Sequence, residues 1–484
     1  MTTAKKIAKN TGVLVLSQII TYLLGFIYIV YVARYLGAAG YGILSFGLAF
    51  TGIFAVAVDL GLNTITTRDL SRDIKKTSNY LTNVTTIKLI LSVIVFLLIA
   101  VTINLLDYPS QTVMVVYFLG LYVIVAAFSQ MFYAIYQAYE EMEYQSIGQV
   151  LNTALILVFT LIAIYYQADV ILVSAIYLLG SMVVLLYNLI ITYWKFSKFH
   201  LGLEKSFWSF KIREALPFGL TSIYGTIYTY IDSVMLSLMQ GDVVVGWYSA
   251  AYRLILIVLY LPGIINQAIF PVMSKFYISS DDILRKVQEK FFKYMLILGF
   301  PIGVGTTVLS NKIILLIFGA GFLPSIFALQ VLIWTIVITF CGAAFVKLFE
   351  ASGRQMVITK VTGVGVAVNI VLNLILIPLY SFIGASIATV LTEMVVVGSI
   401  IALSYRVGYG LPIKENIIII LKVAVSGLVM GAVLWYFNYL NLLILIILGV
   451  LIYIVVLFIT KIFDKEDLTL LRNILKINKN EDEN

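Results

Sequence analysis

Residues 37–45 read Gly-Ala-Ala-Gly-Tyr-Gly-Ile-Leu-Ser, and residues 241–249 read Gly-Asp-Val-Val-Val-Gly-Trp-Tyr-Ser. The two glycines and the serine recur with the same spacing 204 residues later, at Gly241, Gly246 and Ser249. Each copy joins two apolar runs of the length that crosses a membrane, roughly 20 residues for a hydrocarbon core of about 30 Å. The repeated turn indicates that one membrane-spanning unit occurs twice in the chain.

The composition is typical of a membrane protein and not of a soluble domain. Of the 484 residues, 62% are hydrophobic and 12% are charged, and the mean hydropathy is +1.04. Soluble domains have about 45–50% apolar and about 25% charged residues, so this chain has too few charges to cover a globule of its size. The single Cys341 and the single His200 exclude an internal disulfide, a metal cluster built on cysteine or histidine, and a histidine-based catalytic triad.

The apolar runs predict an all-α membrane protein with about fourteen transmembrane helices. The predicted spans are 12–33, 41–61, 80–104, 112–136, 144–166, 169–193, 216–238, 245–273, 287–309, 325–347, 358–379, 382–405, 415–436 and 441–461. With the N-terminus in the cytoplasm, 27 of the 32 lysines and arginines fall on the cytoplasmic side, as the positive-inside rule requires. A missed span would move the later lysines and arginines to the opposite side of the membrane and remove this asymmetry. The charges therefore support the span count and place both termini in the cytoplasm. The net charge of +8 then reflects topology and not a nucleic-acid partner.

The repeat also predicts how the spans are grouped. Each repeated unit contains six spans, an even number, so both copies enter the membrane in the same direction. We therefore expect an N-terminal six-helix lobe over 1–200, a parallel six-helix lobe over 201–410, and two further transmembrane helices over 411–462. Residues 463–484 would form either a cytoplasmic amphipathic helix and tail or a fully solvated tail. Paired lobes around a central cavity are typical of secondary transporters.

Two charged residues lie deep in the second predicted lobe. Asp232 in the seventh span and Arg253 in the eighth both sit about 9–12 Å below the external surface at 1.5 Å per residue. A charge at membrane depth costs roughly 2.5–3.5 kcal/mol on insertion scales, so it normally faces a cavity or a partner. In one interpretation Arg253 binds a phosphate, and Asp232 holds Arg253 or binds a coupling cation. In the other, the two form a structural ion pair that braces their helices.

A second set of charges lies toward the cytoplasmic side of the first lobe. Asp59 and Lys88 fall near the cytoplasmic third of the second and third spans, and Arg68 and Arg72 follow just outside the membrane. The arginines stand where an anionic head group would enter. The alternatives are a structural ion pair for Asp59 and Lys88, and anchoring by the positive-inside rule for the two arginines.

Four further residues are candidates for the cavity. Glu393, near the middle of the twelfth span, suits Na⁺ or H⁺ coupling, or is a hydrogen-bonded structural carboxyl group. Lys347 ends the tenth span and either lines the cavity or extends to the membrane interface. Tyr28 and Tyr224 lie on the first and seventh spans, too deep for an interfacial aromatic belt. Their rings and hydroxyls suit sugars, so we expect both to line the cavity.

Several motifs resemble those of polysaccharide exporters of the MOP superfamily, the Wzx-type flippases for lipid-linked oligosaccharides. Residues 59–72 (DLGLNTITTRDLSR) resemble the end of the second span in that family, and residues 34–42 (RYLGAAGYG) resemble its first external turn. Residues 247–253 (WYSAAYR) resemble the counterpart in the second half, and residues 350–354 (EASGR) the turn after the tenth span. The similarity extends along nearly the whole chain.

The resemblance implies two six-helix lobes around a V-shaped cavity, with two trailing helices. It also implies that a polyprenyl phosphate- or pyrophosphate-linked oligosaccharide moves from the cytoplasmic to the external leaflet, for the assembly of cell-surface polysaccharide. Related flippases have a cationic cavity, which suits a phosphate-bearing head group. Arg253, Lys88, Arg68 and Arg72 would attract that phosphate.

We therefore predict a flippase that works by alternating access in the cell membrane, with a lipid-linked glycan, membrane lipids and glycan-assembly enzymes as partners. The sequence contains no Gly-x-x-x-x-Gly-Lys-[Ser/Thr] phosphate loop, so we expect no cofactor and a Na⁺, H⁺ or substrate gradient as the energy source. A cation-coupled multidrug antiporter of the same superfamily is the alternative, and it would favour carboxylates in both lobes. A membrane glycosyltransferase or polymerase would carry larger external loops, so we do not expect an enzyme.

Overall fold

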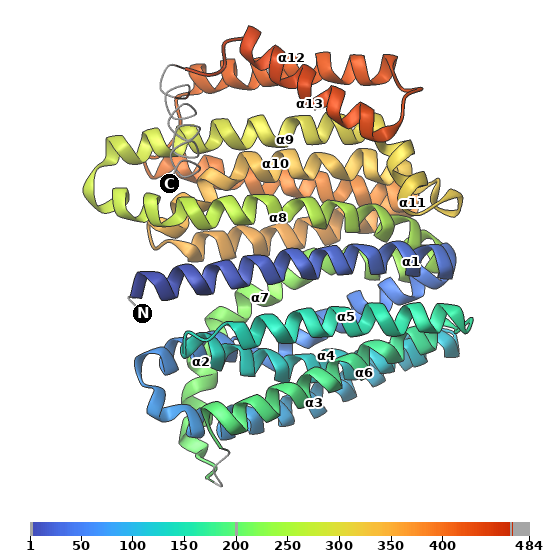
Figure 1. Ribbon diagram of the computed structural model, residues 1–484, viewed down its shortest axis with the longest axis vertical. Helices are drawn as coiled ribbons and strands as arrows, with labels where there is room; N and C mark the ends of the chain where they lie inside the picture. The colour runs from blue at the N-terminus through green and yellow to red at the C-terminus, as the bar shows by residue number, and fades with distance from the viewer. Residues whose placement is uncertain (1–2, 199–201, 465–466, 468–484) are drawn as a thin grey trace, which may run out of the picture. The chain divides into compact units, whose positions relative to one another are not determined.

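The computed structural model describes residues 3–198, 202–464 and 467, and these residues form helices and turns without a β-strand. Figure 1 shows the chain from blue at the N-terminus to red at the C-terminus. The α-helices are α1 (Thr3–Asp59), α2 (Leu62–Arg72), α3 (Thr77–Leu105), α4 (Ser110–Ala138), α5 (Glu143–Tyr165), α6 (Val170–Ile191), α7 (Lys205–Gln240), α8 (Asp242–Ser279), α9 (Asp281–Ile317), α10 (Ser325–Ala351), α11 (Gln355–Arg406), α12 (Ile413–Tyr436) and α13 (Leu442–Ile459). Three short helical turns join them, η1 (Ile74–Lys76), η2 (Thr192–Phe196) and η3 (Ala320–Phe322).

Each predicted membrane span lies within one of these helices, apart from one or two residues at an end, so the all-α membrane fold is confirmed. Eleven helical stretches of the described residues are long and apolar enough to cross a membrane. Two of them, Lys9–Arg72 and Gln355–Arg406, each cover two predicted spans. The helix over the seventh predicted span, α7, is not among the eleven. A helix too polar to face lipid on all sides is expected to turn its polar side toward protein or a cavity.

Single residues separate the two spans within α1 and within α11. Gly37 has φ 64° and ψ −176° inside α1, and Ser381 has φ 54° and ψ −135° inside α11. Glycine adopts such a conformation without a steric penalty, whereas serine is strained there. Each residue therefore marks a turn between two helical segments that share one label, α1 or α11.

The sequence analysis missed α2 as a separate helix. The predicted second span ends at residue 61, and the structure has a break there, with Leu60 and Gly61 at positive φ. Helix α2 then buries Leu62, Ile65 and Leu70 against α3, α4 and α7. Its sequence is polar overall and apolar on one face only, so a search for long apolar runs does not detect it.

The contacts divide the chain into two compact units. The first comprises Met1–Ala250, Phe318–Phe322 and Thr362–Ala385, and within it α4 packs against α6, while α1 packs against α4, α5 and α7 (Figure 1). In the second, which holds the remaining residues, α9 packs against α10 and α12, and α12 against α13. This grouping by contact does not test the predicted lobes 1–200 and 201–410, which follow the sequence repeat. The two lobes and the cavity between them stay predictions.

The predicted amphipathic helix at the C-terminus lies outside the described residues, except for its first two residues and Asp467. Asp467 is buried, and it accepts hydrogen bonds from Lys293 and Tyr294 of α9. These two contacts fix the start of the tail to α9. Whether residues 463–477 form a helix at the membrane interface stays a prediction.

Candidate functional site

The two copies of the repeated turn contact each other directly. A Cβ atom on Gly42 would lie 1.8 Å from the carbonyl oxygen of Asp242, and a Cβ on Gly246 would lie 2.0 Å from the carbonyl oxygen of Ala38. Gly42 corresponds to Gly246 in the repeat, and Ala38 corresponds to Asp242. The contact is therefore reciprocal, as expected when two copies of one element meet about a two-fold axis. We call these four residues the glycine contact.

The backbone supports the repeat as well. Gly37 and Gly241, which begin the two copies, have φ 64° and 84° with ψ −176° and 178°. This region of conformational space is essentially restricted to glycine. The repeat predicted from the sequence is thus present in the backbone as two matching turns that meet at the glycine contact.

Asp232 lies in a buried network of oxygen-bearing side chains in the first unit. Its carboxylate, on α7, accepts a hydrogen bond from the Tyr248 hydroxyl at 2.7 Å and from the Asn373 amide at 2.6 Å. The Asn373 amide also donates to the Asn369 side-chain oxygen at 3.0 Å. All four residues are at most 2% exposed. We call them the Asp232 network.

The Asp232 network has the ligand chemistry of a site for a small cation. The side-chain oxygen of Asn373 is buried without a hydrogen-bond partner. With the carboxylate of Asp232 and the oxygens of Asn369 and Tyr248, it forms a cluster of hard oxygen donors around one negative charge. Na⁺ prefers such oxygen ligands, as other hard cations do, and a proton can neutralise the same carboxylate.

The sequence analysis identified Asp232 but not the two asparagines. Asn369 and Asn373 are four residues apart on α11, so they share one helix face. Two amides on one face of an apolar run could have indicated a buried polar site from the sequence, because amides are uncommon in apolar runs. Their proximity to Asp232 depends on the packing of α7 and α11, which sequence spacing does not give. The predicted pairing of Asp232 with Arg253, which lies in the second unit on α8, stays a prediction.

Lys88 forms a fully satisfied buried network. Its ammonium group donates to a carboxylate oxygen of Asp59 at 2.9 Å, to the side chain of Asn63 at 3.0 Å and to the Ala127 carbonyl at 3.0 Å. The side chain of Lys88 is fully buried. All three donors of the ammonium are therefore used, and a phosphate would have to break this network to bind there.

Asp59 also stabilises the break between α1 and α2. Its two carboxylate oxygens accept hydrogen bonds from the backbone amides of Gly61 and Asn63, both at 3.2 Å. The predicted pair of Asp59 and Lys88 thus exists and supports a strained turn. Its geometry agrees with the structural alternative, while a role in substrate binding stays a prediction.

Arg68 belongs to a ring of charges that joins α2 to α7. It contacts Asp69 at 2.8 Å and Glu214 at 2.5 Å, and Lys211 contacts the same two carboxylates at 2.6 and 2.9 Å. The hydroxyl of Tyr80 also donates to Asp69. We call Arg68, Asp69, Lys211 and Glu214 the charge ring. Because the ring contains two cations and two anions, it is neutral as a whole.

A cavity of about 450 Å³ opens beside the charge ring. It is lined by the ring, by Tyr80 and by five further residues, which are Arg72, Asp73, Lys76, Asn79 and Phe207. Lys76 pairs with Asp73 at 3.4 Å, whereas Arg72 is exposed and forms no ion pair within the described part of the chain. Of the two predicted phosphate-attracting arginines that line this cavity, Arg68 and Arg72, the latter is therefore the one whose guanidinium is available.

The charge ring predicts a pH-dependent stability. Hydrogen bonds from Lys211 and Arg68 hold the pKa of the Glu214 carboxyl below its ordinary value of 4.5. A carboxyl group with a lowered pKa stabilises the fold above its ordinary pKa, and this contribution is lost as the pH falls through the lowered value. Glu214→Gln should therefore reduce stability by about 0.5–1 kcal/mol near pH 7, since partly exposed ion pairs contribute little, and by progressively less as the pH falls below 4.5.

Thermal unfolding of purified protein between pH 7 and pH 3 measures this effect. Asp282→Asn, at an exposed carboxyl on α9 with no ion pair among the described residues, is the control and should not change the pH profile. An equal loss of stability for Glu214→Gln at every pH would contradict the expectation.

The other charged candidates lie in the second unit. Arg253 is half-buried on α8. Lys347 forms an ion pair with Glu350 three residues away and lies 5.9 Å from the centre of the Phe270 ring. Glu393 accepts a hydrogen bond at 2.7 Å from the hydroxyl of Thr339 on α10. The roles predicted for these three residues stay predictions.

The two tyrosines predicted to line the cavity pack against helices of the first unit. Tyr28 is 7% exposed, and its ring meets the edge of Tyr177 on α6 at 5.7 Å. The ring of Tyr224 covers Gly363 on α11, 3.0 Å from where a Cβ would lie. Contact of either ring with a sugar stays a prediction.

Sequence comparison relates the chain to polysaccharide export. A family model described as "Polysaccharide biosynthesis protein" matches residues 7–277. A probable low-salt glycan biosynthesis flippase of Haloferax volcanii, Agl15, is 25% identical over 89% of this chain and 90% of that protein. An uncharacterized membrane protein of Methanocaldococcus jannaschii is 29% identical over 55% of this chain, and the match spans only 54% of that protein's length.

Solved structures share the fold. The lipid II flippase MurJ, in an inward closed conformation, matches 91% of this chain and 97% of its own with a TM-score of 0.72 at 17% identity. An inward-facing multidrug resistance transporter of the MATE family, in the MOP superfamily, matches 80% of this chain and 94% of its own with a TM-score of 0.64 at 19% identity. At these identities the structural matches establish a shared fold and nothing finer.

Proposed function

This chain belongs to the polysaccharide biosynthesis protein family, and from that premise we propose that it is a flippase for a lipid-linked oligosaccharide. The substrate would be carried on polyprenyl phosphate or pyrophosphate and would move from the cytoplasmic to the external leaflet by alternating access. The probable flippase of Haloferax volcanii supports this assignment, because it is similar over nine tenths of its length.

The single observation that carries the mechanism is the glycine contact. Alternating access requires an end of the transporter that closes tightly and opens again. At the glycine contact, two copies of one turn meet backbone to backbone with no side chain between them. Such a contact closes the path at the end where Gly37 and Gly241 lie, which we place on the external side.

The phosphate of the carrier lipid would first meet Arg72 at the cytoplasmic side. The cavity beside the charge ring exposes this guanidinium, and a guanidinium can bind phosphate with two parallel hydrogen bonds. Arg253 would hold the phosphate later in the cycle, with Lys347 nearer the cytoplasmic side. Arg68 and Lys88 would contribute only after their present ion pairs open.

The Asp232 network would couple transport to a Na⁺ or H⁺ gradient. The motivating observation is a buried carboxylate beside an amide oxygen without a partner. Binding of a cation would neutralise Asp232 and satisfy that oxygen. Glu393, hydrogen-bonded to Thr339, is the second candidate for a coupling carboxyl.

The location follows from the same proposal. The chain is a multi-pass membrane protein, and a flippase for surface polysaccharide would work in the cell membrane with both termini in the cytoplasm. Glycan-assembly enzymes would act before and after it on the same lipid-linked substrate. The multidrug antiporter is the weaker alternative, because the MATE match is one of fold while the Haloferax relative named above is described as a flippase.

Reconstitution tests this function directly. Purified protein is reconstituted into vesicles that carry a fluorescent lipid-linked oligosaccharide in one leaflet. Transport should bring the fluorescent label into contact with a quencher that is added outside the vesicles. A vesicle without protein and one with a labelled phospholipid are the controls. Export of cationic drugs without movement of the glycolipid would overturn the proposal in favour of the antiporter.

Substitution of Arg253 by lysine distinguishes the contribution of its positive charge to phosphate binding from that of its planar guanidinium. Arg253→Lys keeps the positive charge but loses the planar pair of donors, so transport of the phosphate-bearing lipid should slow by about tenfold. The reconstituted assay measures the rate, and Arg285→Lys, on α9, is the matched control. Unchanged transport by the Arg253 variant would remove it from the phosphate site.

A further inference from the structure

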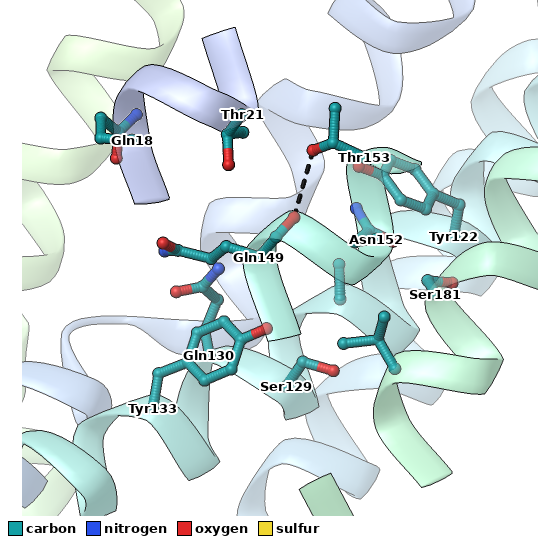
Figure 2. A pocket seen from close by; sticks show the side chains of 12 residues that line it. Gln18, Thr21, Tyr122, Ser129, Gln130, Tyr133, Gln149, Asn152, Thr153 and Ser181 are labelled. Carbon is teal, nitrogen blue, oxygen red and sulfur yellow. Dashed lines mark hydrogen bonds between the residues drawn. The ribbon is translucent and has the colours of Figure 1, made fainter. Parts of the chain in front are cut away.

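A cavity of about 210 Å³ lies inside the first unit between α1, α4, α5 and α6 (Figure 2). It is separate from the Asp232 network and from the charge ring, and the mechanism above does not use it. The twelve residues that line it are Gln18, Thr21, Tyr122, Ala126, Ser129, Gln130, Tyr133, Gln149, Asn152, Thr153, Ser181 and Val184. We call it the neutral cavity, because none of these residues carries a charge.

Ten of the twelve lining residues have a polar side chain. Side-chain amides come from α1, α4 and α5, at Gln18, Gln130, Gln149 and Asn152. Hydroxyl groups come from all four helices, and the rings of Tyr122 and Tyr133 form part of the wall (Figure 2). All four helices are long and apolar enough to cross a membrane. Such a concentration of amides between membrane-spanning helices requires a polar occupant, since lipid offers no hydrogen bonds.

Part of this polar lining lacks partners within the protein. The hydroxyl groups of Thr21 and Ser129 and the side-chain oxygen of Asn152 are buried without a hydrogen-bond partner. Ser129 is only 5% exposed. By contrast, Thr153 donates to the Gln149 carbonyl (Figure 2). A buried polar group left unpaired is unfavourable, so the unpaired atoms indicate the places where an occupant would bond.

The chemistry of the wall selects the class of occupant. A cation would need a carboxylate and a phosphate would need a lysine or arginine, and the lining has neither. Amides and hydroxyls offer both donors and acceptors, which match the hydroxyl and N-acetyl groups of an uncharged sugar. The tyrosine rings offer apolar surfaces for the C–H faces of a sugar ring.

The size and position of the cavity narrow the choice of occupant further. Pockets for drug-sized ligands have about 300–1,000 Å³, so 210 Å³ suits a single sugar ring and not an extended oligosaccharide. Gln18 and Gln130 are exposed, whereas Ser129 and Ser181 are buried. A sugar would enter past the two glutamines and reach the serines at the inner wall.

We propose that the neutral cavity is a subsite that binds one uncharged sugar unit of the transported glycan through Asn152, Gln149 and Ser129. This inference rests on the proposed flippase function, and it adds where the glycan, as distinct from its phosphate, is recognised. Transport would then favour glycans with a neutral hexose or N-acetylhexosamine at the position that reaches the cavity.

Sugar binding to the purified full-length protein tests the proposal. The probes are the methyl glycosides of glucose and N-acetylglucosamine, with glucuronic acid as the charged comparison, observed by saturation-transfer NMR. The wild type should bind one of the neutral probes and not glucuronic acid. Asn152→Leu, which keeps the side-chain size but removes the amide, should weaken binding about tenfold.

Asn104→Leu is the matched control. Asn104 lies on α3 in the same unit, donates to Ala100 and Tyr117, and is absent from the cavity wall. This variant should bind the neutral sugar as the wild type does. Gln149→Leu gives a second measurement at the cavity if Asn152→Leu does not fold, and it should also weaken binding.

The outcomes separate the two proposals. If neither neutral probe binds, or if both cavity variants bind as the wild type does, the cavity holds only water and the sugar subsite is overturned, whatever the transport assay gives. If sugar binding depends on Asn152 while the wild type moves no lipid-linked glycan, the flippase proposal fails and the sugar site stands.

Discussion

Gly246→Ala should slow glycolipid transport by at least about a hundredfold, the largest effect we expect from a single methyl group. The added Cβ would lie 2.0 Å from the Ala38 carbonyl oxygen, well inside van der Waals contact. Overpacking usually costs about 1–3 kcal/mol, and here the opposing atom is backbone, which cannot rotate away as a side chain does. The two turns would be held apart, and the external end would not close.

A distance measurement separates this effect from misfolding. Spin labels at Ala39 and Val243, which are repeat-related positions on the two exposed turns, should move apart in the Gly246→Ala variant, in a background in which Cys341 is replaced by serine. Gly225→Ala is the control, since a Cβ there meets open space. It should leave the distance between the labels unchanged. It should also not destabilise α7, because alanine is a better helix former than glycine. A Gly246→Ala protein with wild-type transport and distance would refute the gating role.

Asp232→Asn should remove the dependence of transport on a Na⁺ or H⁺ gradient and slow gradient-driven transport about a hundredfold. The carboxylate accepts hydrogen bonds from Tyr248 and Asn373 at a buried site. Hydrogen bonds to a charged group contribute about 1.5–3 kcal/mol each. Asparagine keeps the shape of the side chain but removes the charge that would bind a cation or a proton.

A charge exchange makes this test specific. In the double variant Asp232→Asn with Asn373→Asp, the carboxylate moves to a side chain that lies 2.6 Å from its original position. Ion dependence should return in part, which a merely structural role for Asp232 would not produce. Asp107→Asn, at an exposed turn after α3, is the matched control and should transport normally. Full ion dependence in the Asp232→Asn single variant would assign coupling to another residue, with Glu393 the next candidate.

The sequence predicted the helices well because the length of an apolar run is a local property. A run of about 20 apolar residues has to be a helix when it lies in lipid, since every backbone group must be paired within it. The repeated glycine turns were also readable, because a positive φ restricts the residue type at Gly37 and Gly241. Helix α2 was missed because it is short and polar, and it is held by packing against other helices.

The candidate sites were predicted only in part. Charges at membrane depth, such as Asp232 and Lys88, stand out in a sequence because they are costly there. Their partners do not, as Asn373 is 141 residues from Asp232 in the chain. The amides of the neutral cavity were missed for the same reason, because Gln18 and Asn152 are unremarkable until α1 and α5 bring them together.

The sequence by itself determined that this protein crosses the membrane many times, that one glycine turn occurs twice, and which charges must find partners inside it. The tertiary structure alone decided that the repeated turns meet through glycine, that Lys88 is fully paired, and that neutral amides enclose a cavity. The reason is physical: transfer from water to lipid depends on one segment at a time, whereas hydrogen bonds and close packing depend on residues that only folding brings within a few ångströms.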